Sequence, residues 1–202
     1  CIHKNLNIVA FNTINTTSII NNNVVLNNEV LYNTLDNRLL LGNHNLSNIM
    51  IVLTISKILN LNMYTVVKTI NSFKGLEHRL EYVGKYNDII YYNDSIAAIP
   101  DATINAIESL KNVDTLIFGG MDRGISYEEF IDYLNTGKVR NLICMPTTGY
   151  KIGDRITNTN VNVYKIEMLN DAVKLAKEIT MKGKICLLSP AASSYEYFKN
   201  LR

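Results

Sequence analysis

Apolar residues follow two different rhythms along this 202-residue chain, and the change falls near residue 75. Before that point, short apolar or alternating runs are interrupted by asparagine, which is typical of antiparallel strands joined by turns. The runs are Ile8–Phe11, Thr17–Ile20, Val24–Leu26 and Leu39–Leu41. Helical spacing of apolar residues begins only at Asn45 and extends to about Asn60, and a second short helix is expected over Thr65–Asn71.

Beyond residue 75, short apolar strand patterns alternate with helical patterns. We expect strands over Ile89–Tyr92, Thr115–Phe118, Asn141–Met145, Val161–Ile166 and Ile185–Leu188. We expect helices over Pro100–Lys111, Tyr127–Asn135, Leu169–Met181 and Ser194–Leu201, with a weaker one near Gly149. This alternation favours a mostly parallel sheet with helices on both faces. The predicted fold is therefore α/β. The residues before this α/β region form a strand-and-helix module. We expect that module to be an incomplete part of a larger domain, because it begins in a strand-rich region with no helix before the strands.

Composition narrows the functional classes. A formal charge of +2, with no run of Lys or Arg, argues against nucleic-acid binding. The three cysteines form no C-x-x-C pair, which argues against a disulfide framework or a zinc cluster. The longest apolar stretch, Ile49–Leu59, is too short to span a bilayer, and residues 1–20 lack the pattern of a signal peptide. We expect a protein of the reducing cytoplasm with no membrane partner.

Polar residues gather where apolar segments end, which is where α/β proteins place ligand-binding loops. These polar islands are Gly42–Asn48, Gly75–Glu81, Asn93–Ser95, Gly119–Gly124 and Leu188–Ser194. Among them, Asp94 follows a predicted strand, where a carboxylate suits a ribose or an amino group. Asp and Ser are also favoured helix caps, so this island alone does not identify a ligand.

Two further islands suit anionic groups but have ordinary structural explanations as well. The glycine pair Gly119-Gly120 would let a ligand approach the backbone closely, yet it matches neither the G-x-G-x-x-G pattern nor a phosphate loop. Arg123 could clamp a carboxylate with two hydrogen bonds, or could be a solvated turn residue. Ser189 and Ser194 flank the start of the last predicted helix, where free N–H groups suit a carboxylate and where Ser is also a common cap.

His78 and Arg79 lie near the expected boundary between the two modules, which we place at Leu76–Glu81. Clefts between domains are common ligand sites, and a guanidinium group suits a phosphate chain. A lone histidine is more often a structural residue, so this island too is ambiguous when taken alone.

Taken together and in order, the islands resemble the carboxyl-terminal half of the Mur ligases, the ATP-dependent enzymes that add amino acids to the bacterial cell-wall precursor. The shared pattern is Gly42-x-His44-Asn45-x-x-Asn48, Gly75-Leu-x-His78-Arg79-x-Glu81, Asn93-Asp94-Ser95, Gly119-Gly120 and Leu188-Ser-Pro-Ala-x-x-Ser194. Similarity is greatest to the members that add D-glutamate to UDP-N-acetylmuramoyl-L-alanine. The resemblance implies that residues 1–77 are the end of a central ATPase domain, and that residues 78–202 form the C-terminal Rossmann-like ligase domain.

The resemblance also implies a reaction and its binding residues. With ATP and Mg²⁺, the carboxylate of UDP-N-acetylmuramoyl-L-alanine would become an acyl phosphate, which the amine of D-glutamate attacks during peptidoglycan synthesis in the bacterial cytoplasm. The residues that would face ATP, the last of them at the ribose, are Asn48, His78, Arg79 and Asp94. The residues that would hold the amino acid are Ser95, Arg123, Ser194, Tyr195 and Leu201. Arg123 stands where the family has a lysine.

Two departures from the family pattern bear on function. The family's Asp-Ser-Lys-Ala-Thr reads Asp94-Ser95-Ile96-Ala97-Ala98 here. The apolar Ile96 cannot pair with a carboxylate, so the identity and stereochemistry of the added amino acid are open and Arg123 would carry more of that load. A phosphate loop and the magnesium ligands are also absent from residues 1–202, and in the family they precede residue 1. We therefore expect no catalytic residue and no metal ligand in these 202 residues, and no activity from them alone.

Other functions are compatible with parts of the pattern. A ligase that adds L-glutamate or another amino acid would explain Ile96 and Ala98, and so would a noncatalytic module that binds a nucleotide or an amino acid. A folylpolyglutamate synthase is disfavoured by Ser189-Pro-Ala and by Gly75-Leu-Glu-His-Arg79. A Rossmann-type oxidoreductase would need a glycine fingerprint after a strand, and the sequence has none.

Overall fold

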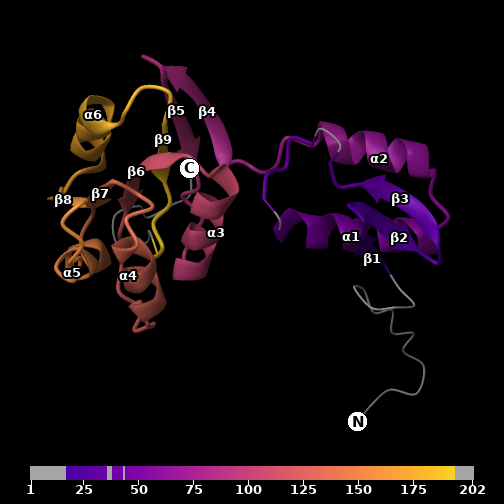
Figure 1. Ribbon diagram of the computed structural model, residues 1–202, viewed down its shortest axis with the longest axis horizontal. Helices are drawn as coiled ribbons and strands as arrows, with labels where there is room; N and C mark the ends of the chain where they lie inside the picture. Colours follow the sequence, from indigo (N-terminus) through magenta and orange to yellow (C-terminus); the bar gives the residue numbers. More distant parts are fainter. Residues whose placement is uncertain (1–16, 36–37, 43, 194–202) are drawn as a thin grey trace, which may run out of the picture. The chain divides into compact units, whose positions relative to one another are not determined.

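The computed structural model describes residues 17–35, 38–42 and 44–193. The chain divides into two compact units, Cys1–Lys74 and Gly75–Arg202 (Figure 1). Each unit has its own sheet and its own buried apolar core. The assignment of residues 1–77 and 78–202 to two Mur ligase domains stays a prediction.

The first unit opens with an antiparallel three-stranded sheet in the order β1 (Ser18–Ile20), β2 (Asn23–Leu26) and β3 (Glu29–Asn33). Both of its hairpin turns are asparagine pairs, and all four residues have positive φ, from 48° to 65°. Two successive left-handed residues form the turn that matches the twist of paired strands, and asparagine tolerates that conformation. The abundant asparagines therefore have a structural use in this unit.

The predicted strands at Thr17–Ile20 and Val24–Leu26 are confirmed, and β3 is a strand that the sequence analysis does not predict. The strand expected at Leu39–Leu41 is wrong, because this segment is irregular. There, the Arg38 guanidinium donates hydrogen bonds to the carbonyl groups of Thr34 and Leu40, each at 2.8 Å, and folds the segment into a loop. The strand expected at Ile8–Phe11 lies outside the described residues.

Two helices complete the first unit, α1 (His44–Ile58) and α2 (Met63–Ser72), and both were predicted. The side chain of Asn62 caps α2 by accepting a hydrogen bond from the Thr65 N–H group at 3.0 Å. The core of the unit is formed by the strands and by one face of each helix. Its buried members are Val24, Leu31, Tyr32, Ile49, Met50, Leu53 and Ile70.

The second unit is built on a six-stranded sheet with the order β4-β5-β9-β6-β7-β8. Its strands are β4 (Glu81–Tyr86), β5 (Ile89–Asn93), β6 (Val113–Phe118), β7 (Asn141–Cys144), β8 (Asn162–Lys165) and β9 (Ile185–Leu188). The last five pair in parallel and confirm the predicted strands. Strand β4 was not predicted and pairs antiparallel to β5 at the edge of the sheet.

Helices cover both faces of this sheet, as predicted. They are α3 (Pro100–Leu110), α4 (Glu128–Asn135), α5 (Thr148–Gly153) and α6 (Leu169–Ile179). One core, around Phe118 and Phe130, joins the sheet to α3, α4 and α5. Helix α6 lies on the other face (Figure 1). Its residues Ala172 and Ala176 pack on Ile117 and neighbouring strand residues. The helix expected at Ser194–Leu201 lies outside the described residues. The second unit is thus an α/β domain with a mostly parallel sheet.

Candidate ligand-binding site

The sheet order brings three of the polar islands to one edge of the second unit, the edge at which the parallel strands have their carboxyl ends. Strand β9 lies between β5 and β6, and its residue Leu188 is paired with Asn93 on one side and Ile117 on the other. The loops that leave the carboxyl ends of these three strands are therefore neighbours. Ligands of open α/β sheets bind at this kind of edge.

Asp94 is the centre of a buried junction at this edge. Its Oδ1 accepts a hydrogen bond from the Leu80 N–H group at 3.0 Å, and its Oδ2 accepts one from the Ser189 hydroxyl at 2.8 Å. The hydroxyl of Thr103, in α3, lies 2.8 Å from Ser189 Oγ and donates to it, because the Ser189 proton is directed at Asp94. Asp94 thus connects three segments: the chain that enters β4, the loop after β9, and α3. A contact between Asp94 and a ribose stays a prediction.

A second cluster lies beside this junction and contains His78, Glu81 and Asn93. The Asn93 side-chain oxygen accepts a hydrogen bond from the Ser95 N–H group, so the Asn93 amide nitrogen faces His78 Nδ1 at 2.9 Å. An amide nitrogen can only donate, so Nδ1 is the acceptor and the ring proton is on Nε2. Glu81 Oε2 accepts from the His78 N–H group at 2.9 Å and fixes the backbone there. The exposed His78 ring therefore offers an Nε2–H donor.

Arg79 follows His78 directly and is exposed. Its side chain forms no hydrogen bond and no ion pair with the residues that the structure describes. Because its guanidinium is not committed to a neighbouring carboxylate, it is suited to an external anion such as a phosphate group.

The pair Gly119-Gly120 serves the packing of loops rather than an open approach to a ligand. Gly119 has φ of +124°, and a Cβ there would overlap the carbonyl oxygen of Met145. A Cβ on Gly120 would lie 2.5 Å from the carbonyl oxygen of Ser193. The space beside both glycines is thus filled by the protein's own backbone, which explains the need for glycine without a ligand.

The loop after the glycines is anchored at several points. The Met121 N–H group donates to the Ser193 carbonyl oxygen at 2.9 Å. Asp122 accepts a hydrogen bond from the Gly124 N–H group at 2.9 Å and lies 2.8 Å from Lys151 Nζ in α5. The hydrogen bond from Lys151, followed by that from Gly124, lowers the pKa of Asp122. These contacts hold the loop that carries Arg123.

Arg123 itself is exposed, and its guanidinium has no hydrogen bond or ion pair with the described part of the chain. The pKa of the nearby Tyr127 is raised chiefly by burial. The charge of Asp122 raises this pKa further, whereas the charge of Arg123 lowers it. Sequence reasoning missed Lys151 and Tyr127, since neither belongs to a polar island at the end of a strand. An uncommitted guanidinium on an anchored loop is well suited to a carboxylate.

The structure brings together some of the predicted site residues, whereas others belong to the first unit or lie outside the described residues. His78, Arg79, Asp94 and Ser95 lie around one junction, and Arg123 lies on the loop after β6 at the same edge. Asn48 belongs to the first unit, where its exposed side chain donates to Asn45 Oδ1 at 3.2 Å. The predicted residues Ser194, Tyr195 and Leu201 lie outside the described residues.

Possible metal ligands are scattered in the described ranges, and both described thiols are buried. Residues 17–35, 38–42 and 44–193 contain no group of three or more His, Cys, Asp or Glu side chains that could hold a metal ion. Burial raises the pKa of both Cys144 and Cys186 to about 12, so neither thiol ionises at neutral pH. Within the same ranges, no helix is both long enough and apolar enough to cross a bilayer.

Known proteins match this chain over most of its length. The family model described as "Mur ligase, glutamate ligase domain" matches residues 78–192. The UDP-N-acetylmuramoylalanine–D-glutamate ligase of Caldanaerobacter subterraneus subsp. tengcongensis is 36% identical over 162 residues, which are 79% of this chain and 36% of the relative. The enzyme of the same name from Listeria monocytogenes is 34% identical over 179 residues, covering 89% of this chain and 39% of the relative. The chain spans little more than a third of the length of these relatives.

A solved structure supports the fold independently. The UDP-N-acetylmuramate–alanine ligase of Thermotoga maritima matches with a TM-score of 0.60 and 20% identity, over 78% of this chain and 36% of that one. At this identity, the likeness concerns the fold alone.

Proposed function

The chain belongs to the Mur ligase family, and on that premise we propose that it is part of an ATP-dependent ligase that adds D-glutamate to UDP-N-acetylmuramoyl-L-alanine in peptidoglycan synthesis. The observation that carries this proposal is the identity of 36% with a D-glutamate ligase over 79% of the chain. Because the chain covers about a third of that relative, the activity is proposed for the full-length parent in the bacterial cytoplasm. Residues 1–202 alone are expected to be inactive.

We propose that ATP is contacted by Asn48, His78, Arg79 and Asp94. The Nε2–H group of His78 and the uncommitted guanidinium of Arg79 are donors suited to phosphate oxygens. Asp94 already accepts two hydrogen bonds within the protein. The contact with the ribose is proposed because Asp94 follows β5 at the carboxyl end of the sheet, where open α/β sheets bind ligands. We place the ligands of the accompanying Mg²⁺ mostly outside these residues.

For the amino acid, we propose Arg123 as the main carboxylate partner, with Ser95, Ser194, Tyr195 and Leu201 as further contacts. Arg123 is supported by its exposure and by the anchored loop that carries it. Ile96 is half exposed and apolar where the family has a lysine, so it offers no charge to a carboxylate. Arg123 is therefore left as the cation of this site among the proposed residues.

The role of these residues in the reaction is to hold ATP and the incoming amino acid and to orient them. ATP supplies the phosphoryl group that activates the precursor's carboxylate. Positive charge near the phosphoryl oxygens, from Arg79, stabilises charge that develops there. Binding the carboxylate of the incoming amino acid at Arg123 fixes its amine relative to the activated carbonyl carbon, and such positioning lowers the barrier.

A second candidate is favoured by Ile96 and Ala98, which replace the lysine and threonine of the family pattern. A ligase that prefers L-glutamate or another amino acid would not need those two side chains. A module that binds a nucleotide or an amino acid without catalysis would not need them either.

The proposal is tested by ATP-dependent phosphate release from the full-length parent. The parent is given UDP-N-acetylmuramoyl-L-alanine with D-glutamate, with L-glutamate or with no amino acid. Release that requires D-glutamate supports the proposed ligase. A preference for L-glutamate replaces it with the variant ligase, and no release with either amino acid favours the noncatalytic module.

A further inference from the structure

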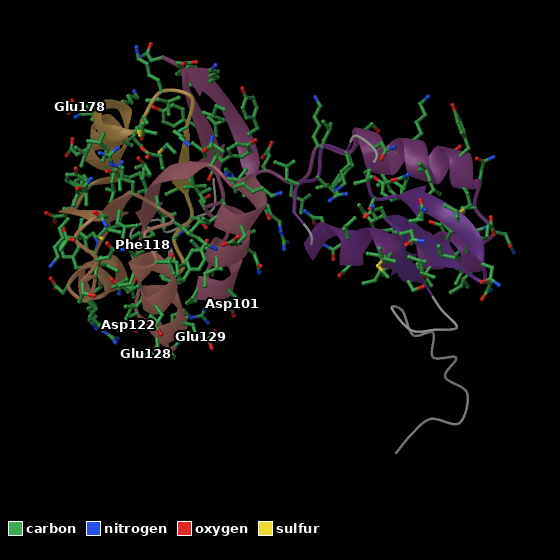
Figure 2. All side chains as sticks on the ribbon, viewed as in Figure 1. Asp101, Phe118, Asp122, Glu128, Glu129 and Glu178 are labelled. Carbon is green, nitrogen blue, oxygen red and sulfur yellow. The ribbon has the colours of Figure 1, made fainter. Side chains whose placement is uncertain are left out.

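Acidic side chains flank Arg123 in the sequence, yet its guanidinium is paired with none of them in the described part of the chain. Asp122 directly precedes it and Glu128 opens α4, and both lie at the same end of the second unit (Figure 2). Each is paired with a base from another segment. Asp122 lies 2.8 Å from Lys151 in α5, and Glu128 lies 2.6 Å from Arg155 just after α5. The neighbours of Arg123 are thus neutralised from outside its loop.

The carboxylate of Asp122 has a partner on each oxygen. Its Oδ1 accepts a hydrogen bond from the Gly124 N–H group at 2.9 Å, and its Oδ2 accepts one from Lys151 Nζ at 2.8 Å. Only Lys151 brings a compensating charge. Without it, an ionised carboxylate would stand one residue from the Arg123 guanidinium, where it attracts that cation and repels any other carboxylate.

The backbone of this loop is held by contacts that do not involve Lys151. The Gly120 carbonyl oxygen accepts a hydrogen bond from the Thr148 N–H group at 3.0 Å, and the Met121 N–H group donates to Ser193 at 2.9 Å. The Lys151 side chain is 64% exposed, and an ion pair between exposed groups contributes little to stability. The effect of Lys151 is therefore on the charge beside Arg123 more than on the shape of the loop.

We propose that Lys151 is a positioning residue for the incoming amino acid: it binds and neutralises Asp122, so that the Arg123 guanidinium stays available for the substrate's carboxylate. This inference rests on the proposed function, in which Arg123 binds that carboxylate. Lys151 does not touch the substrate and acts through Asp122 and Arg123. Because the effect concerns a carboxylate, it applies to D-glutamate and to L-glutamate alike.

Steady-state kinetics of the full-length parent test the proposal. Lys151→Ala is expected to raise KM for the amino acid about two- to fivefold, the range that a partly exposed ion pair supports, and to leave KM for ATP unchanged. Lys151→Arg keeps the positive charge and should stay near wild type. Asp122→Asn combined with Lys151→Ala should return KM towards wild type, because the uncompensated charge is gone and an asparagine oxygen still accepts from the Gly124 N–H group.

The double variant separates a role in charge from a role in structure. If it is impaired as much as Lys151→Ala, then Lys151 only supports the loop and the proposal is overturned. An unchanged KM in Lys151→Ala also overturns it. The matched control is Lys138→Ala, which breaks the ion pair of 2.6 Å with Glu108 in the last turn of α3 and should not change KM for the amino acid.

Chemical modification tests the same arrangement without the reaction. Phenylglyoxal modifies arginine side chains, and peptide mass spectrometry of the full-length parent, without substrates, follows Arg123 with the exposed Arg79 as internal reference. Lys151→Ala is expected to slow modification of Arg123 about two- to fivefold, because Asp122 becomes free to pair with it, and the double variant should restore the rate.

The two readouts distinguish this inference from the proposed function. Slower modification of Arg123 in Lys151→Ala, in a parent that releases no phosphate with either glutamate, would reject the ligase and keep the arrangement of charges. Normal phosphate release with unchanged modification and unchanged KM would reject the role of Lys151 and keep the ligase.

Discussion

Helices α1 and α6 both bury one face against a sheet, but their outer sides differ in kind. On α6, Ala172 and Ala176 face the sheet, and the exposed residues include Lys177 and Glu178, the latter labelled in Figure 2. On α1, the side away from the sheet is apolar. The comparison teaches that α6 has the charged outer side of a surface helix, whereas α1 has an apolar side that a surface helix normally lacks.

The largest effect on stability is expected from a charge placed on the side of α6 that faces the sheet. Ala176→Asp places an unpaired carboxylate where the side chain is fully buried, and we expect a loss of about 3 to 5 kcal/mol in the free energy of unfolding of the second unit. Urea denaturation followed by circular dichroism measures this. Glu178→Ala on the exposed side is the control and is expected to stay within about 0.5 kcal/mol of wild type. Similar losses in both variants would contradict the assignment of the two sides.

The corresponding change on α1 is Ile55→Asp, and its effect should depend on the length of the protein. In the full-length parent, where the first unit is expected to be part of a larger domain, a carboxylate that becomes covered on this side is expected to cost about 2 to 3 kcal/mol. In the 202-residue chain, where the site faces water, the change is expected to stay within about 0.5 kcal/mol. Denaturation of both proteins measures the difference, with Tyr64→Asp as the exposed control. An equal effect in the two lengths would mean that the apolar outer side of α1 stays exposed to water in the parent, as the charged outer side of α6 does.

The proposed function adds to the comparison, because the second unit is proposed to hold the amino acid. In the full-length parent, Arg123→Ala is expected to raise KM for the amino acid roughly 10- to 100-fold, since it removes a charge-assisted pair of hydrogen bonds. Arg123→Lys should restore much of the loss, because the family has a lysine there. The matched control is Arg79→Ala, which is expected to raise KM for ATP instead. An unchanged KM for the amino acid in Arg123→Ala would remove this residue from the site.

The smallest effect concerns the anchor of the Arg123 loop. Asp122 has a lowered pKa in the folded protein, so its ion pair stabilises the fold above the ordinary value of 3.8 and ceases to do so as the pH falls through the lowered value. Lys151→Ala removes the largest cause, and we expect the pKa of Asp122 to move back towards 3.8 but not to reach it, because the Gly124 N–H group remains. Carbon-detected NMR titration of the carboxyl group measures the shift. Lys177→Ala, on α6, should leave it unchanged.

The strands and helices with strong periodicity were predictable from the sequence, whereas strand β4 and the loop at Leu39–Leu41 were not. The parallel strands are continuous apolar runs because both faces of their sheet are covered. Strand β4 (Glu81–Tyr86) lies at the sheet edge, is largely exposed and contains Gly84, so its sequence lacks a strand signal. The pattern at Leu39–Leu41 looks like a strand, but hydrogen bonds from Arg38 hold that segment as a loop.

For the candidate site, the sequence located the loops but not the partners within them. Asp94 and Ser189 are separated by 95 residues, and only the sheet order brings them together at 2.8 Å. The role of the paired glycines was also hidden, because the atoms that crowd Gly119 and Gly120 come from Met145 and Ser193, distant in sequence. Such contacts depend on tertiary structure, which single-sequence periodicity does not encode.

The position of β9 has a consequence for how the second unit is made on the ribosome. Strand β9 is the last of the sheet to be synthesised, yet it lies between β5 and β6. Until residues 185–188 emerge, the hairpin β4-β5 and the block β6-β7-β8 share no strand and each presents an open edge. Unpaired edges of this kind recruit other chains. A nascent or truncated polypeptide that ends before Ile185 is therefore exposed to aggregation, and the unit closes only when its final strand is inserted.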